Sequence, residues 1–166
     1  QKQQKQDTSQ PFGKDPFPQS MVGTWETWLG PEQKLSITFA DDGAIPDICH
    51  YVFGPMTAEA GGIYKEGPDA GTYMEAVLGP IRAEYNARLN KLKMTIPIEA
   101  YTMQFVEGVL KGRIIDTYIG APSKDGKIWV AEWRSYSWLE GATEPAIDFI
   151  DNNPQILKFR KSVVDQ

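Results

Sequence analysis

The sequence predicts an all-β protein, an antiparallel up-and-down β-barrel of about 8–10 strands. Apolar and polar residues alternate in several short segments, which is the pattern of half-buried strands. The 15 glycines and 12 prolines supply turns between these segments. Two long alternating segments, residues 109–119 and 127–139, are typical of the tilted walls of a barrel. A β-sandwich is the rival architecture.

The composition bounds the class of protein. A chain of 166 residues, 41% of them hydrophobic, suggests one domain with a sizeable core. A net charge of −5 with dispersed lysines argues against a nucleic-acid partner. No apolar run reaches the roughly 18 residues of a transmembrane segment. The single cysteine, Cys49, excludes an internal disulfide and a cysteine-pair metal site.

The N-terminal segment, residues 1–19, is rich in Gln and Lys and holds three prolines. We expect it to be a flexible or loosely docked leader, followed by one β-barrel domain over residues 20–166. The chain starts at Gln1 without Met, as a protein with its signal peptide removed would, and a trimmed chain would start in the same way. We favour the first interpretation and expect a secreted or periplasmic protein.

The first predicted strands follow this leader. Residues 22–29 contain Trp25 and Trp28, which point to opposite faces if the segment is a strand. We expect Trp25 inside and Trp28 outside. Residues 34–39 alternate cleanly, and Asp42-Gly43 after them is a strong hairpin signal. Residues 48–53 form the third predicted strand.

The middle of the chain is less regular. Residues 54–71 are dense in Gly and Pro and predict a long loop of the kind that often serves as a lid. Residues 71–78 predict a fourth strand. Residues 81–90 alternate as a strand but also show helical spacing, and the flanking strands favour a strand. Residues 92–98 alternate again, and Pro97 indicates an edge strand or a strand end.

The last part of the chain holds the two long strands, which turn at Asp125-Gly126. A final strand is centred on residues 156–159. Residues 144–153 fit one helical turn or a short strand, and the pattern leaves both open.

The motif Gly23-Thr24-Trp25 opens the first strand, and Arg160 lies on the last. This arrangement resembles the lipocalin-like proteins of the calycin superfamily. The resemblance implies that Trp25 closes the barrel floor and that Arg160 packs over it, with Lys158 as the reserve. Such a cation–π contact contributes roughly 0.5–2 kcal/mol. The single cysteine sets the chain apart from secreted lipocalins with their disulfide pair, and favours a looser, bacterial-type lipocalin-like domain.

Candidate ligand contacts come from the faces of the two long strands. One face of residues 127–139 carries bulky residues with small residues between them, a pattern that suits a cavity wall: Trp129, Ala131, Trp133, Ser135 and Ser137. The hypothesis is a ligand pocket with an arginine that holds a ligand carboxylate, built from Trp129, Trp133, Tyr118, Tyr73 and Arg134, with Arg113 as a second choice for the arginine. The competing interpretation is ordinary core packing inside a solvated outer wall.

The sequence gives little support for a catalytic site. His50, the only histidine, has no nucleophile motif to serve, and neighbouring Cys49 points to the other face of the strand, which disfavours a shared metal site. Two inward carboxylates would allow acid–base work, and the candidates on predicted strands are Glu26, Glu75, Glu84, Glu132 and Asp116. We assign no catalytic residue, metal or cofactor.

The functional hypothesis is therefore a non-enzymatic, extracytoplasmic binding protein for a small, largely apolar molecule held in a barrel cavity. Two alternatives remain: an envelope-associated interaction or structural module without a small ligand, and a barrel enzyme, such as an isomerase, cyclase or hydrolase, acting on an apolar substrate. The sequence does not determine the oligomeric state.

Overall fold

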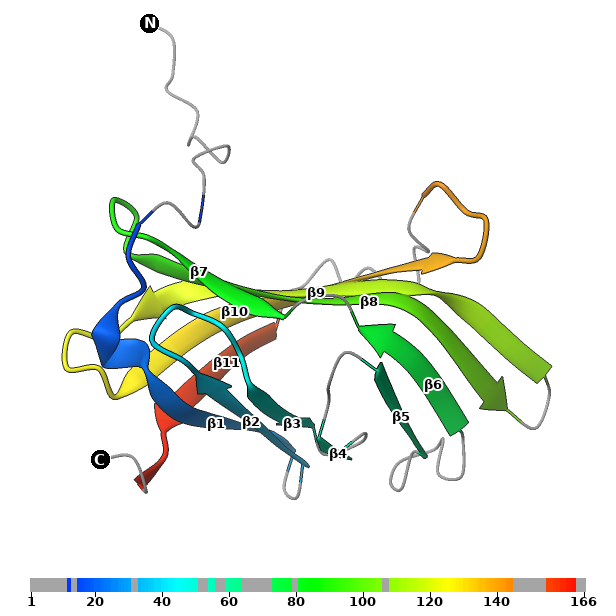
Figure 1. Cartoon of the computed structure of the whole chain (residues 1–166), viewed down its shortest axis with the longest axis horizontal. Helices are drawn as coiled ribbons and strands as arrows, with labels where there is room; N and C mark the ends of the chain where they lie inside the picture. The colour runs from blue at the N-terminus through cyan, green and yellow to red at the C-terminus, as the bar shows by residue number, and fades with distance from the viewer. Residues whose placement is uncertain are drawn as a thin grey trace, which may run out of the picture.

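A computed structural model describes residue 12 and residues 15–30, 33–50, 54–55, 59–63, 73–78, 81–105, 108–144 and 155–163. These residues form one antiparallel sheet that curls into a half-barrel (Figure 1). The prediction of an all-β, antiparallel, up-and-down fold is confirmed, and the curled sheet is compatible with a calycin-like fold. In the described part of the chain, no helix has the length and apolar character needed to cross a membrane.

The described part of the chain contains eleven strands: β1 (Gly23–Gly30), β2 (Gln33–Phe39), β3 (Asp47–His50), β4 (Gly54–Pro55), β5 (Glu59–Ile63), β6 (Tyr73–Leu78), β7 (Arg82–Asn86), β8 (Lys91–Phe105), β9 (Gly108–Pro122), β10 (Ile128–Leu139) and β11 (Gln155–Lys161). Their hydrogen-bonded order is β4-β3-β2-β1-β11-β10-β9-β8-β6-β5, and β7 also pairs with β8. The long strands β8, β9 and β10 span the molecule, while β1–β4 and β5–β6 curl away from them (Figure 1).

Two expectations for the middle of the chain are corrected. Part of the expected loop 54–71 forms β4 and β5, and β5 pairs with β6 at one end of the sheet, a position that tolerates its glycines. Pro97 lies inside the 15-residue β8 rather than at its end. The pairing of β8 with β7 extends to Thr95, and its pairing with β6 starts at Ile98, so Pro97 lies between the two paired stretches on this edge of β8.

The ambiguous segment 81–90 resolves into strand β7, as the flanking strands indicated. A turn over residues 87–90 follows, and Asn90 adopts a positive φ of 50° there. The antiparallel pairing of β7 with β8 excludes the helical alternative. Of the other ambiguous segment, only residue 144 lies inside the described ranges.

The turn after β2 joins the two sides of the curled sheet. The backbone N–H of Ala83 donates to the carbonyl of Gly43 at 2.8 Å, and Ala44 forms a bridge with Arg82. A Cβ on Gly43 would overlap the carbonyl oxygen of Ala83, and its φ of +89° also favours glycine. The Asp-Gly turn predicted at residues 42–43 thus brings β2 against β7.

The N-terminal segment completes the core at the end of the sheet where the turn after β2 meets β7. Phe17 is buried, and the 3₁₀ turn Gln19–Met21 places the fully buried Met21 beside Trp25. Asp15 accepts a hydrogen bond from the N–H of Ala87 at 2.8 Å. Residues 15–19 of the predicted leader therefore pack against the domain.

Trp25 is fully buried and donates its indole N–H to the carbonyl of Met21 at 2.9 Å. The cation over its ring is Lys161, with Nζ at 5.8 Å from the ring centroid, and not Arg160. Buried Leu157 and Phe159 set the inward parity of β11, so Lys161 faces inward. Arg160 and the reserve candidate Lys158 point outward and are exposed, which corrects that assignment.

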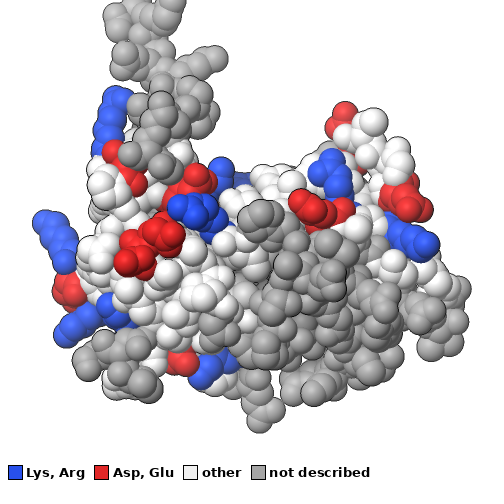
Figure 2. Space-filling view, viewed as in Figure 1, with Lys and Arg blue, Asp and Glu red and all other residues white. Residues whose placement is uncertain are grey.

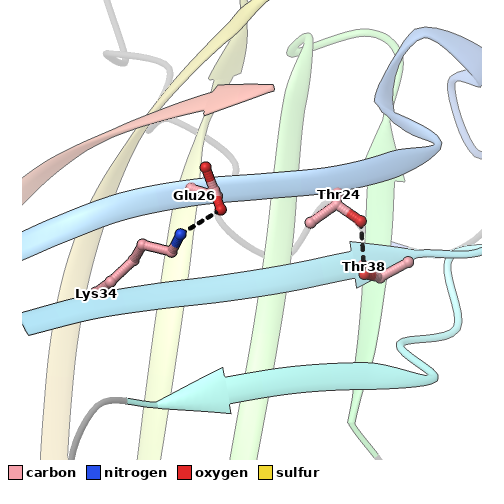
Figure 3. A network of polar contacts seen from close by, with 4 residues as sticks. All are labelled: Thr24, Glu26, Lys34 and Thr38. Carbon is pink, nitrogen blue, oxygen red and sulfur yellow. Dashed lines mark hydrogen bonds and ion pairs between the residues drawn. The ribbon is translucent and has the colours of Figure 1, made fainter. Parts of the chain in front are cut away.

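The outer face of β1 and β2 is polar. Lys34 pairs with Glu26 at 2.7 Å, and the hydroxyls of Thr24 and Thr38 meet at 2.8 Å (Figure 3). Trp28 lies on this face with 58% of its surface exposed, and Lys34 Nζ is 5.7 Å from its ring centroid. The two tryptophans of β1 therefore face opposite sides, as predicted. Basic and acidic side chains are interspersed on the face shown in Figure 2.

Candidate functional site

The concave wall of the half-barrel is built from facing positions on β8, β9 and β10. Directly opposed residues of antiparallel strands point to the same side. Tyr118 pairs with Trp133, and Asp116 pairs with Ser135. The next opposed pair on this side is Ile114 with Ser137. The other neighbour of β9 is β8, where the residues opposite Tyr118, Asp116 and Ile114 are Met94, Ile96 and Ile98. The burial of these three apolar residues and of Tyr118 identifies this side as the interior.

Asp116 is the chemically distinctive group of the concave wall. Its Oδ1 atom is buried and has no hydrogen-bond partner among the described residues. Burial raises the pKa of Asp116 from its ordinary 3.8 to about 6, against the smaller lowering effects of Ser135 and Trp133. The Trp133 N–H lies near the carboxyl, but Nε1 makes no hydrogen bond of good geometry to any of the described residues. The carboxyl changes charge close to neutral pH.

Trp133 and Tyr118 form an aromatic pair beside this carboxyl. Their rings are stacked, with an interplanar angle of 5° and centroids 6.0 Å apart. Burial raises the pKa of the Tyr118 hydroxyl well above its ordinary value, and the charge of Asp116 adds to the effect. The hydroxyl therefore stays protonated at neutral pH. The buried Ser137 Oγ is a third polar atom on this wall that has no partner in the described part of the chain.

The residues predicted to contact a ligand do not all lie at one site. Trp133 and Tyr118 share the concave wall, as proposed from the sequence. Trp129 is fully buried, donates its indole N–H to the Gly120 carbonyl at 3.0 Å and stacks on Phe159 at 4.8 Å. It belongs to the core beneath the wall. Tyr73 begins β6, and its side chain lies outside the described residues.

Arg134 does not join the site. It lies on the opposite face of β10 from Trp133, where it pairs with Glu132 at 2.7 Å. Alternation along the strand requires this separation. Arg113, the second choice, also lies outside, with its guanidinium carbon 4.1 Å from the Trp138 ring centroid. Neither arginine is placed to hold a ligand against Trp133.

Arg113 and Trp138 instead line an outer cleft of about 380 Å³. The four charged residues of this cleft are exposed to solvent and of both signs: Glu99, Lys111, Arg113 and Glu140. Charges that are already hydrated gain little from a new partner. We therefore assign the candidate site to the concave wall, where buried polar atoms are not satisfied by any described residue.

In the sequence, Asp116 is one of several carboxylates on predicted strands and does not stand out as part of the ligand site. The available signal was its parity, because it lies two residues from Tyr118 and must share its face. The register that sets it opposite Ser135 was not available from the pattern.

No group of three or more His, Cys, Asp and Glu side chains that would hold a metal occurs among the described residues. The side chains of His50 and Cys49 on β3 lie outside the described set. Comparison of the chain with protein-family models, with curated proteins and with solved structures found no match.

From the raised pKa of Asp116 we predict how the free energy of unfolding depends on pH. In the unfolded chain Asp116 ionises near its ordinary pKa of 3.8, and in the folded chain near 6. Folding therefore disfavours the charged form, so this group lowers stability as pH rises from about 4 to 6, and the loss is complete above 6. The full effect is on the order of 2–3 kcal/mol.

The variant Asp116→Asn removes this ionisation. We expect it to be more stable than the parent at pH 8, with the difference shrinking toward pH 4, in urea titrations at several pH values. The other carboxylates titrate in both proteins, so the difference between the two curves isolates Asp116. A difference that stays constant across this range would contradict the raised pKa.

Proposed function

We propose that this protein is a lipocalin-like binding protein that holds a small, largely apolar molecule against the concave wall of β8, β9 and β10. The observation that carries the proposal is a set of buried polar atoms there that have no hydrogen-bond partner among the residues the structure describes: Asp116 Oδ1, Trp133 Nε1 and Ser137 Oγ. Buried polar groups are nearly always paired. Leaving one unpaired costs about 1–3 kcal/mol, so a ligand that pairs them gains that free energy.

The rest of the wall supports a largely apolar ligand. The neighbours of the polar atoms on β8 are Met94, Ile96 and Ile98, all buried, and Ile114 lies on β9. Small-molecule sites are mostly apolar with a few polar groups that fix orientation. The stacked rings of Tyr118 and Trp133 add broad apolar surface. The secreted or periplasmic location stays a prediction of the sequence.

The proposal is tested with N-phenyl-1-naphthylamine, an uncharged aromatic probe that fluoresces in apolar surroundings. We expect saturable binding at one site per chain. Ser135→Trp adds an indole to the concave wall and should weaken binding at least tenfold. Arg134→Trp adds the same ring to the outer face of the same strand and should leave binding unchanged. No saturable binding by the parent protein, or equal binding by both variants, would reject the site.

A further inference from the structure

Asp116 has no described counter-charge. On β8 the facing residues are apolar, and on β10 they are Trp133, Ser135 and Ser137. Among the described side chains on this face of the three strands, Tyr118 is the one other titratable group. The described basic residues of these strands near the site have the opposite parity and point outward: Lys93, Lys111, Arg113 and Arg134.

We infer that the ligand of the concave wall is an apolar amine, whose ammonium group pairs with the buried carboxylate of Asp116. This inference rests on the binding function proposed above and names the chemical class of its ligand. The apolar part of the amine lies along Ile96, Ile98 and Ile114, and the charged end meets Asp116.

The three common polar ends of an apolar ligand differ in how they satisfy this site. A carboxylate would place a second negative charge beside Asp116, which is unfavourable. A hydroxyl would donate one hydrogen bond and leave the carboxylate charge uncompensated. An ammonium supplies three donors and the opposite charge, and charge-assisted hydrogen bonds are about twice as strong as neutral ones.

The aromatic pair suits the same ligand. The stacked rings of Trp133 and Tyr118 are neighbours of Asp116 on this wall, and an ammonium placed over an indole face would gain a cation–π attraction. Tyr118 keeps its proton at neutral pH, because burial and Asp116 both raise its pKa. It therefore contributes ring surface without adding a second negative charge.

The electrostatics of Asp116 also predict how binding depends on pH. With a pKa of about 6 in the free protein, the carboxyl is largely ionised at pH 7.5 and largely protonated at pH 5. A proton competes with the ammonium for the same oxygens. The affinity for an amine should therefore fall roughly tenfold between pH 7.5 and pH 5, while the affinity for an alcohol stays level.

The test compares three ligands with the same eight-carbon chain, octylamine, octanol and octanoate, by isothermal titration calorimetry on the full chain. At pH 7.5 we expect octylamine to bind at least tenfold more tightly than octanol, and octanoate to bind most weakly. Asp116→Asn should remove the preference for the amine while octanol still binds. Glu132→Gln removes a carboxylate from the outer face of β10 and should leave all three affinities unchanged.

Each outcome separates the two proposals. If octanol and octylamine bind equally, or octanoate binds best, the amine inference fails and the binding function stands. If none of the three ligands and no uncharged aromatic probe binds the parent protein, the binding function fails as well. Should Asp116→Asn fold poorly, the pH series on the parent protein decides, since an amine affinity equal at pH 5 and pH 7.5 overturns the inference.

Discussion

Replacing Trp25 by alanine is expected to lower the free energy of unfolding by about 3–5 kcal/mol. The indole is fully buried, and its N–H donates to the Met21 carbonyl at 2.9 Å. Its removal leaves a cavity beneath the N-terminal turn and an unpaired carbonyl. The stem of Lys161, whose Nζ also donates to the Ser20 carbonyl at 3.1 Å, loses the ring that it covers.

Trp28→Ala is the matched control, because it deletes the same side chain three residues away on the same strand. More than half of Trp28 is exposed, and its contact with Lys34 is a surface one. We expect a loss below about 1 kcal/mol, as for most surface substitutions. Both values come from denaturant titrations under the same conditions. Equal losses would show that Trp25 does not have the core role assigned to it.

The second large effect is expected at Gly120. A Cβ at this position would overlap the carbonyl oxygen of Val130 and lie 2.8 Å from the Cα of Ala131, both on β10. Backbone atoms cannot move aside as a side chain can, so β9 and β10 must separate locally. The Gly120 carbonyl is also the acceptor for the Trp129 indole, at 3.0 Å. Gly120→Ala should therefore cost about 3 kcal/mol or more, the upper end for overpacking.

Ala121→Ser tests whether this cost is specific to Gly120. Ala121 is the next residue of β9, points outward and is exposed. We expect it to change stability by less than about 0.5 kcal/mol. Urea unfolding monitored by far-UV circular dichroism measures both variants. A Gly120→Ala protein as stable as the Ala121→Ser protein would show that the two strands do not approach as closely as described.

Strand parity was the most informative part of the sequence. It placed Trp129 and Trp133 on one face of the segment that forms β10, and that is where they lie. It also separated Trp25 from Trp28. Alternation succeeds here because a sheet with one buried face leaves a period-two pattern in the sequence.

The wrong or incomplete predictions are those in which residue type was preferred to strand parity, or in which parity alone did not place the residue. Residue type favours Arg160 as the cation over Trp25, but the inward Leu157 and Phe159 place Lys161 on that face. The parity of β10 likewise excludes Arg134 from a pocket lined by Trp133. The role of Asp116 needed the register between β9 and β10, which depends on where the turn between them closes. The packing of Phe17 against Phe39, at 5.7 Å, is a contact between distant segments that no local pattern encodes.

The pairing of β1 with β11 has a consequence for how the chain reaches this structure. Thr27 Oγ1 donates to the Lys158 carbonyl across 131 residues of sequence. The strand that holds Trp25 therefore lacks one of its two neighbours until nearly all of the described chain has been synthesised. Contacts of such high sequence separation slow folding, because the loop must be closed before they form. During translation one edge of β1 would stay unpaired, and an unpaired strand edge can pair with other chains. Rapid pairing with β11, or a bound chaperone, would prevent this aggregation.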